Sequence, residues 1–305
     1  MRIFENANYQ FMRNRKIAYA ISGALFVLSL ASLLFRGLEV GIDFLGGMEF
    51  VVESDQPVST AEVRSTLATA LGSEPEVKTF DETGLLIRTA STGDINEVEA
   101  QVLRGVNEAA PGGTHRIVKT DIVGPRFAED LKRGAFYSVI GSLIVIFLYI
   151  WVRFQWKVGY SVGAVAALVH DVVITLGMFS LMHHLNIVPF SLQIDQTIIA
   201  AFLTIVGYSI NDTVVVFDRI REYTTMFKTE NYENVVNRSI NTTLSRTIIT
   251  SGTTLLVVIT LFIFGSEVLR GFAFALLFGI GIGTYSSIFV AAPIVVELRN
   301  RIGAR

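Results

Sequence analysis

Residues 207–222 read GYSINDTVVVFDRIRE and close an apolar run that begins near Ile198. The run is long enough to cross a bilayer, which takes about 20 helical residues at about 1.5 Å each. Asn211 and Asp212 nevertheless lie inside it, before its charged end. A carboxylate at the centre of a membrane helix costs about 2.5–3.5 kcal/mol on insertion scales, so it usually faces inward and has a function. The alternative is that Asp212, past the midpoint of its helix, is hydrated near the headgroups or only bonds a neighbouring helix.

The composition is that of a polytopic membrane protein. Of the 305 residues, 51% are hydrophobic and 17% are charged, and there is no cysteine. This apolar content exceeds that of an ordinary soluble domain. The absence of cysteine excludes disulfides and thiolate chemistry, and a net charge of −2 gives no indication of nucleic acid binding.

Six apolar runs are long enough to cross a hydrocarbon layer of about 30 Å as helices. The first follows several basic residues but is too long for a signal peptide's apolar core, so we expect an uncleaved anchor. Between the first two runs, residues 36–133 hold 17 of the 27 acidic side chains and 10 of the 25 basic ones, which indicates an inserted water-soluble domain. The runs are residues 17–35, 134–152, 158–181, 198–217, 247–265 and 271–296.

Lysine and arginine in the short loops predict the orientation, because cytoplasmic loops are enriched in both. The loop 182–197 has none and the loop 265–270 has only Arg270, whereas the other loops and both ends of the chain are basic. Both termini are therefore expected in the cytoplasm. The predicted parts are residues 1–36, with the first helix; residues 37–130, an extracytoplasmic domain; and residues 131–305, with the other five helices.

The outer domain is predicted to alternate strands and helices. Strands are expected at 48–53, 76–80, 85–89 and 115–123, and helices at 61–71, after a capping box from Ser59 to Glu62, and at 94–110. A turn at 81–84 joins the two middle strands. This βαββαβ order matches a ferredoxin-like fold. No acids, histidines or hydroxyls are grouped as in a catalytic site, which favours a docking domain.

A glycine-rich segment joins the first helix to this domain. Residues 41–47 read GIDFLGG, and Gly41, Gly46 and Gly47 allow backbone angles closed to other residues. We expect a tight or mobile hinge here, although a plain loop fits the same residues.

The third and last helices each carry a stripe of small residues four apart, which lets another helix approach closely. Asp171 lies within the stripe of the third helix, so we expect it to point into the bundle. His170 precedes it, and adjacent residues do not share a helix face, so a His–Asp catalytic pair is not expected and His170 is interpreted as a packing or interfacial residue. The stripes are Gly159, Gly163, Ala167, Asp171, Thr175 and Ala275, Gly279, Gly283, Ser287, Ala291.

Arg246 opens the fifth helix at a depth similar to that of Asp212, so the two pair if their helices touch. The alternative for Arg246 is a snorkelling anchor on the cytoplasmic side. Residues 220–243 between the fourth and fifth helices are predicted to form an amphipathic helix on the inner surface.

Three hypotheses follow for the acids in the membrane. Asp171 or Asp212 takes up and releases protons, because burial disfavours a charged carboxylate and a nearby Arg246 favours it, so a movement of Arg246 would couple protonation to conformation. Alternatively, the acids only stabilise helix packing. A paired-aspartate intramembrane protease is the third hypothesis, but no glycine-flanked aspartate motif supports it. No GxxxxGK[ST] loop is present, which excludes an ATPase of that type.

Residues 207–222 resemble the signature of the SecF family, and residues 41–47 resemble its glycine motif after the first helix. Residues 169–171 and 245–247 are also similar to family motifs. The resemblance covers nearly the whole chain.

The resemblance implies six membrane helices of the resistance–nodulation–division type and an outer domain after the first. It implies a subunit of the bacterial inner membrane, not an enzyme and without cofactor, that works with SecD and often an accessory subunit, beside the SecYEG channel and the SecA motor. Such subunits are thought to use the proton gradient to pull unfolded polypeptides outward. Asp212, with Asn211, and Arg246 match the implied proton pathway, and Asp171 is expected to have a structural or secondary role; no metal site is expected.

Two other functions are compatible with the sequence. A half-sized exporter of the same superfamily would have an apolar cavity and would transport a small amphipathic substrate without SecD. A purely structural assembly subunit would tolerate neutral substitutions of Asp212.

Overall fold

The computed structural model describes residues 8–73, 75–80, 83–90, 93–155, 157–185, 192–265 and 267–303. The chain forms two compact units, and each is described by itself. The helical unit contains Met1–Leu38, Tyr137–Leu185 and Thr197–Arg305, and the outer unit contains Glu39–Phe136 and Asn186–Gln196. The predicted boundaries had left residues 186–196 with the helices.

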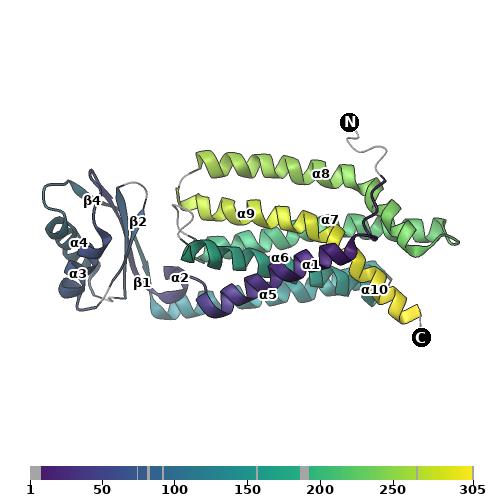
Figure 1. Ribbon diagram of the computed structural model, residues 1–305. Coiled ribbons are helices and arrows are strands. Elements are labelled where there is room, and N and C mark those ends of the chain that lie inside the picture. Colours follow the sequence, from purple (N-terminus) through teal and green to yellow (C-terminus); the bar gives the residue numbers. More distant parts are fainter. Residues whose placement is uncertain are drawn as a thin grey trace. The chain divides into compact units, whose positions relative to one another are not determined.

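Six helices are long and apolar enough to span a membrane among the described residues, as predicted. The first five are α1 (Arg15–Arg36), α5 (Pro125–Arg153), α6 (Val158–His184), α7 (Gln196–Met226) and α8 (Tyr232–Phe264). The sixth consists of α9 (Glu267–Ser286), the π-helical segment η1 (Ser287–Ala291) and α10 (Ala292–Gly303). Arg15 of α1 pairs with Glu233 of α8 and Glu297 of α10, so the start of α1, the start of α8 and the end of α10 lie at one end of the unit (Figure 1).

The prediction of a separate surface helix at residues 220–243 is wrong. α7 continues without a break to Met226, and α8 already begins at Tyr232, where Asn231 caps it by accepting a hydrogen bond from the Glu233 N–H at 2.9 Å. The valines and isoleucines of the segment are buried, among them Val236 and Ile240. These apolar side chains pack into the core of the bundle. The helical parts of the segment are therefore extensions of α7 and α8, and not a separate helix on the membrane surface.

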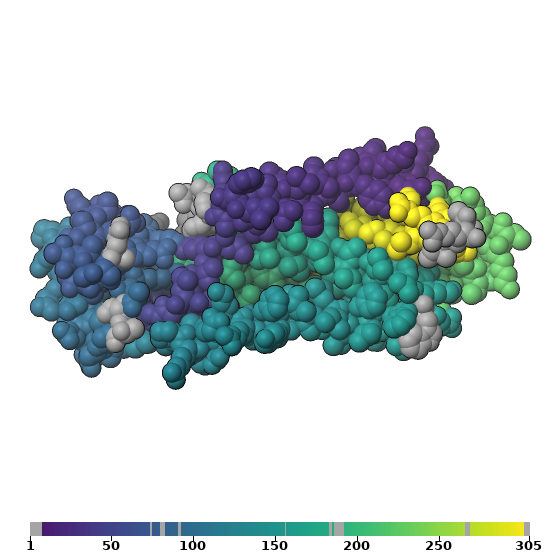
Figure 2. Space-filling view, turned by 90° about the horizontal axis from the view of Figure 1, so that it is seen from below, coloured from purple at the N-terminus to yellow at the C-terminus, as the bar shows by residue number. Residues whose placement is uncertain are grey.

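The small-residue stripes bring the helices into close contact, as predicted. A side-chain carbon added at Gly279 of α9 would lie 2.3 Å from Ile205 of α7. One added at Gly163 of α6 would lie 3.0 Å from the carbonyl oxygen of Ala291. By contrast, α1 and α5 lie at the surface of the helical unit (Figure 2). Many of their apolar side chains are exposed, as expected for helices that face lipid or a partner helix.

The outer unit contains a four-stranded sheet in the order β2-β3-β1-β4, in which all neighbours are antiparallel. The strands are β1 (Gly47–Ser54), β2 (Glu76–Phe80), β3 (Gly84–Thr89) and β4 (His115–Val123), and the helices are α2 (Ile42–Leu45), α3 (Thr60–Leu71) and α4 (Ile95–Ala109). The predicted strands and both longer helices are confirmed. In the predicted turn, Asp81 and Glu82 lie outside the described residues.

Alternating apolar residues bury one side of the sheet against α3 and α4. Phe50 pairs with Ile87 across β1 and β3, and both are fully buried with Leu67 of α3 and Val102 of α4. The Ser59 hydroxyl caps α3 by accepting from the Glu62 N–H at 3.4 Å, as the capping motif predicts. The outer unit therefore has a hydrophobic core of its own.

Candidate functional site

Asp171 is the acceptor at the centre of a polar cluster between helices. Its side chain, on α6, is 1% exposed. One carboxylate oxygen, Oδ2, accepts hydrogen bonds from the Ser209 hydroxyl of α7 and the Ser286 hydroxyl of α9, each at 2.7 Å. Asp171 thus points into the bundle, as its stripe predicts, and links three helices.

The other oxygen of Asp171 contacts His170, contrary to expectation. The Nδ1 atom of His170 lies 2.9 Å from Oδ1 of Asp171. The Cα–Cβ bonds of adjacent helical residues point to different faces, but these two side chains bend toward one another. The imidazole is buried and stacks on Tyr285 at 6.4 Å between ring centroids. Its Nε2 atom has no partner within the described part of the chain. His170 therefore packs, as predicted, but also orients the carboxylate.

A change of helix geometry positions Ser286. The residue ends α9, and the next five form the π-helical segment η1. Short π-helical segments inside α-helices are rare overall, but those that occur are often found at functional sites. Ser286 and Ser287 are both fully buried at this point. The wider turn begins directly after the residue that donates to Asp171.

Asp212 is the acceptor of a second polar cluster. It is 3% exposed on α7, and its Oδ2 atom accepts a hydrogen bond from the Ser251 hydroxyl of α8 at 3.1 Å. The Thr284 hydroxyl of α9 donates in turn to the Ser251 oxygen at 2.8 Å. A chain of two hydroxyl groups therefore leads from α9 through α8 to the Asp212 carboxylate.

The structure does not gather all the predicted residues around Asp212. Asn211 is exposed on α7, as expected for a neighbour on a helix. Arg246 is exposed on α8 and, among the described residues, forms no ion pair within 4.0 Å. Asp212 and Arg246 therefore do not pair directly in the part of the chain that the structure describes.

Helices α7 and α9 each contribute residues to both carboxylate clusters. α7 supplies Ser209 to the Asp171 cluster and carries Asp212, while α9 supplies Ser286 to the first cluster and Thr284 to the second. Any shift of α7 against α9 therefore changes the surroundings of both acids. These hydroxyls could not be predicted as partners of the carboxylates, since serine and threonine are common in membrane helices and carry no signal of their own.

The glycine segment 41–47 adopts angles that require glycine at two positions. Gly46 and Gly47 have φ of 76° and 116°. At Gly47, an added side-chain carbon would lie 2.5 Å from the Thr89 carbonyl oxygen in the neighbouring strand. Gly41 has an ordinary φ of −72°, and its N–H donates to the Ile194 carbonyl oxygen at 2.8 Å.

The comparisons with known proteins agree with this architecture. Residues 105–301 match the family described as "Protein export membrane protein SecD/SecF, C-terminal", and residues 31–58 match the "SecD/SecF GG Motif". The chain belongs to the SecD/SecF family.

Curated relatives place the chain with the SecF subunits of that family. "Protein translocase subunit SecF" from Rhodothermus marinus is 64% identical over 305 residues, covering 100% of this chain and 98% of the relative. The SecF subunit from Desulfurispirillum indicum is 43% identical over 300 residues, covering 95% and 92%. The crystal structure of SecDF from Thermus thermophilus, titled a translocon-associated membrane protein, has a TM-score of 0.86 and 35% identity. The match covers 99% of this chain but only 40% of that longer one.

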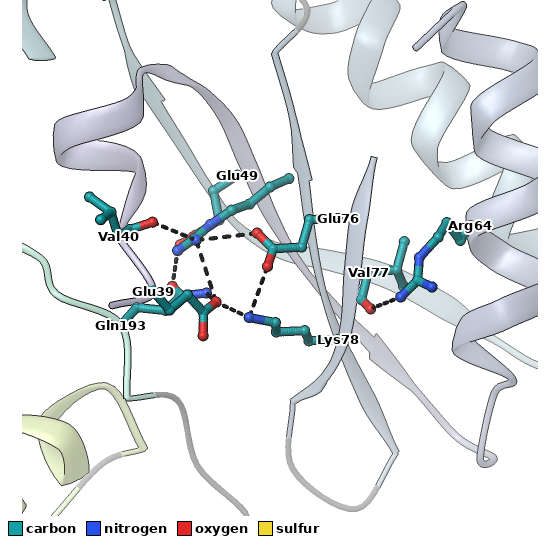
Figure 3. A network of polar contacts seen from close by, with 9 residues as sticks. Glu39, Val40, Glu49, Arg64, Glu76, Val77, Lys78 and Gln193 are labelled. Carbon is teal, nitrogen blue, oxygen red and sulfur yellow. Dashed lines mark hydrogen bonds and ion pairs between the residues drawn. The ribbon is translucent and has the colours of Figure 1, made fainter. Parts of the chain in front are cut away.

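The outer unit of this SecD/SecF chain contains a polar network with a largely buried centre, which includes Glu39, Glu49 and Gln193 (Figure 3). Arg88 of β3 is at its centre, with a side chain only 10% exposed. Its guanidinium donates to Glu49 of β1 at 2.6 Å and also bonds the side chain of Gln193. Gln193 and Lys78 both contact the Glu39 carboxylate directly. The network therefore ties the segment before α2 and the segment before α7 to the sheet.

Removal of the central charge should destabilise the outer unit. Arg88→Met leaves the 11% exposed Glu49 carboxylate without its cation, and breaking a buried pair in this way costs about 3–5 kcal/mol. Arg116→Met is the matched control, since Arg116 pairs with Glu53 at a similar distance of 2.8 Å but both are exposed, a pair worth about 0–1 kcal/mol. Thermal unfolding and protease sensitivity of the full chain measure both. Equal effects of the two substitutions would contradict a central role of Arg88.

Loss of the Ser251 hydroxyl should have a smaller effect, confined to the Asp212 cluster. Ser251→Ala removes the hydrogen bond that this hydroxyl donates to a buried carboxylate. A hydrogen bond to a charged group stabilises a protein by about 1.5–3 kcal/mol, so the variant should lose about this much. In Thr253→Ala, the control on the same helix, the lost hydroxyl is exposed and bonds only backbone carbonyls, so we expect a change below about 0.5 kcal/mol. The melting temperatures of the purified variants in one detergent give the comparison. A Ser251 variant as stable as the threonine control would show that the hydrogen bond is not formed.

Proposed function

We propose that the chain acts as the SecF half of a translocase formed with SecD, which uses the proton gradient to promote export of polypeptides across the bacterial cytoplasmic membrane. The match to curated SecF translocase subunits supports a transport role. The likeness to part of a longer SecDF chain supports SecD as the partner. SecYEG with SecA, and an accessory subunit, are proposed as the surrounding machinery.

One observation carries the proton-coupled mechanism, namely the surroundings of Asp212. The carboxylate is buried and accepts from the neutral Ser251 hydroxyl, and it forms no ion pair with Arg246 within the described part of the chain. A small approach of Arg246 would favour the ionised carboxylate, and its withdrawal would favour the protonated one. Protonation from one side and release to the other would then follow helix movement. A membrane potential supplies about 2.3 kcal/mol per charge per 100 mV for such a movement.

The other proposed pathway residues have different roles. Asn211 is exposed beside Asp212 and would extend the pathway toward a partner helix covering α7. Asp171 would respond to the same movement through Ser209 and Ser286, as a secondary proton site or as structural support.

Movement of the outer domain would deliver the force to the exported polypeptide. The strand order β2-β3-β1-β4 with two helices supports a ferredoxin-like fold for this domain, inserted between α1 and α5. Gly41, Gly46 and Gly47 would serve as its hinge, and the positive φ of Gly46 and Gly47 supports special backbone conformations there. With both termini in the cytoplasm, residues 37–130 would lie on the outer side of the membrane.

Complementation tests the proposal. Cells lacking their native SecF are supplied with the chain, and the export rate of a secreted reporter is measured with and without a protonophore, together with co-purification of SecD. We expect restored export, bound SecD, and loss of the restored fraction when the gradient is dissipated. Cells without the chain give the baseline effect of the protonophore. Proton coupling would be contradicted if the protonophore lowers export no more in cells with the chain than in cells without it. Export without bound SecD would contradict the partnership.

A further inference from the structure

A cavity of about 590 Å³ opens among four helix ends of the helical unit. It is lined by the start of α6, the end of α7, the start of α8 and the end of α10. Successive membrane helices run in opposite directions, so these four ends lie on one side of the membrane, the side of the chain termini. Cavities of about 300–1,000 Å³ are typical of ligand sites. The volume and position fit a ligand at the depth of the lipid headgroups.

Three cations line the cavity, and no acidic residue among those the structure describes does. Lys157, Arg221 and Arg299 form no ion pair within 4.0 Å among the residues the structure describes, whereas Arg153, Arg219 and Arg238 at the same end are paired. Arg153 contacts Asp218 at 2.8 Å, for example. An arginine carries five N–H donors, and Arg221 uses one of them on the carbonyl oxygen of Arg153 at 3.4 Å. The cavity therefore holds positive charge that its own lining leaves uncompensated.

Two further features orient these charges toward an anion. The Arg299 guanidinium lies 3.8 Å from the centre of the Tyr232 ring, a cation–π contact that fixes its position. Val158 and Gly159 line the cavity in the first turn of α6, where backbone N–H groups favour anions. The hydroxyls of Thr224 and Thr225 already donate to backbone carbonyls, so the cations and the helix end are the groups that would hold an anion.

The remaining wall is apolar and is formed by Val158, Val295, Leu298 and the rings of Tyr160 and Tyr232. A fully hydrated ion gains nothing from such a wall. An anion with an attached hydrocarbon chain satisfies both halves of the lining, because its phosphate meets the cations and its chain meets the aliphatic side chains. Basic pockets between membrane helices bind anionic lipid headgroups in this way.

We propose that this cavity binds the phosphate of an anionic amphiphile, which in a membrane is an anionic phospholipid. The site is independent of Asp171 and Asp212, and its occupant would hold together the ends of α6, α7, α8 and α10. Binding is expected to respond to the three unpaired cations and to the shape of the cavity, and not to the total charge at this end of the protein.

Lipid exchange into the purified full chain tests the proposal, with phosphatidylglycerol and phosphatidylcholine as probes and bound lipid counted by native mass spectrometry. The triple variant Lys157→Gln, Arg221→Gln, Arg299→Gln should bind phosphatidylglycerol roughly 100-fold more weakly, since each surface cation contributes about fivefold. The control triple variant Arg153→Gln, Arg219→Gln, Arg238→Gln removes three paired cations and should stay within about twofold. Phosphatidylcholine should bind all forms weakly.

A second variant keeps the test valid if the triple variant unfolds. Gly159→Leu leaves every charge in place and adds an aliphatic side chain at a residue that lines the cavity, where an added Cβ has room beside Leu298 Cβ at 3.8 Å. It should also lose phosphatidylglycerol. Inorganic phosphate is the second probe: binding of phosphate alone with the same dependence on the three cations would overturn the lipid as the source. Equal phosphatidylglycerol binding by the cavity and control variants would overturn the site itself.

Discussion

Asp212→Asn is expected to abolish proton-driven export while the chain still assembles with SecD. Asparagine is nearly isosteric with aspartate, and its side-chain oxygen still accepts the hydrogen bond from Ser251 that the carboxylate accepts at 3.1 Å. The amide does not titrate, however, so movement of Arg246 no longer changes its protonation. Packing among α7, α8 and α9 should therefore persist without proton coupling.

The measurement is export of a secreted reporter in cells lacking the native copy, with SecD co-purification from the same cells. Asp218→Asn is the matched control, because it is the same substitution on the same helix, at a residue that forms a partly exposed ion pair with Arg153. Its export should remain near that of the unchanged chain. Normal export by the Asp212 variant would contradict the proposed coupling, and loss of SecD would show that Asp212 mainly holds the bundle together.

Gly177→Ala is expected to destabilise the helical unit strongly, although alanine favours helices. A side-chain carbon at Gly177 of α6 would lie 2.2 Å from the Cβ atom and 2.5 Å from the Cα atom of Ser29 in α1. Because a backbone atom is in the way, the two helices have to separate, and overpacking of this kind costs about 1–3 kcal/mol. Separation would also strain the hydrogen bond between the Ser32 and Ser180 hydroxyls, which are 2.9 Å apart.

Gly281→Ala provides the matched control for this prediction. Gly281 lies in α9 with nothing within 4 Å of an added Cβ atom, so the substitution should be neutral or stabilise by about 0.4–1 kcal/mol. In the same detergent, Gly177→Ala should therefore lower the melting temperature, whereas Gly281→Ala should leave it unchanged or raise it. A Gly177 variant as stable as the Gly281 variant would contradict the close packing of α1 on α6.

The membrane helices and the elements of the outer unit could be predicted because their signals are local. Each apolar run is continuous in sequence, and basic residues mark the end of each run that is predicted to be cytoplasmic. The strands alternate, and Ser59 and Asp94 cap the helices that follow them. The error at residues 220–243 arose because a polar segment with few apolar residues looks like a surface helix, although Val236 and Ile240 pack into the bundle.

The polar clusters could not be predicted because their members are far apart in sequence. Ser286 is 115 residues from Asp171, and Gln193 is 105 residues from Arg88. Neither partner has a residue type or spacing that marks it, so only the packed structure brings them together. The contact between His170 and Asp171 was missed for a different reason, since facing rules for helices describe Cβ directions and not the reach of a flexible side chain.

A stalled export intermediate offers the most direct test of proton coupling through Asp212. Inverted membrane vesicles containing the chain, SecD and the SecYEG channel are loaded with a preprotein whose export is halted by removing ATP. A proton gradient is then imposed, and the length of preprotein protected from protease is followed with time. The gradient should drive the preprotein forward in vesicles with the unchanged chain and with Asp218→Asn, but not with Asp212→Asn. Equal forward movement with Asp212→Asn would contradict the central role of this carboxylate.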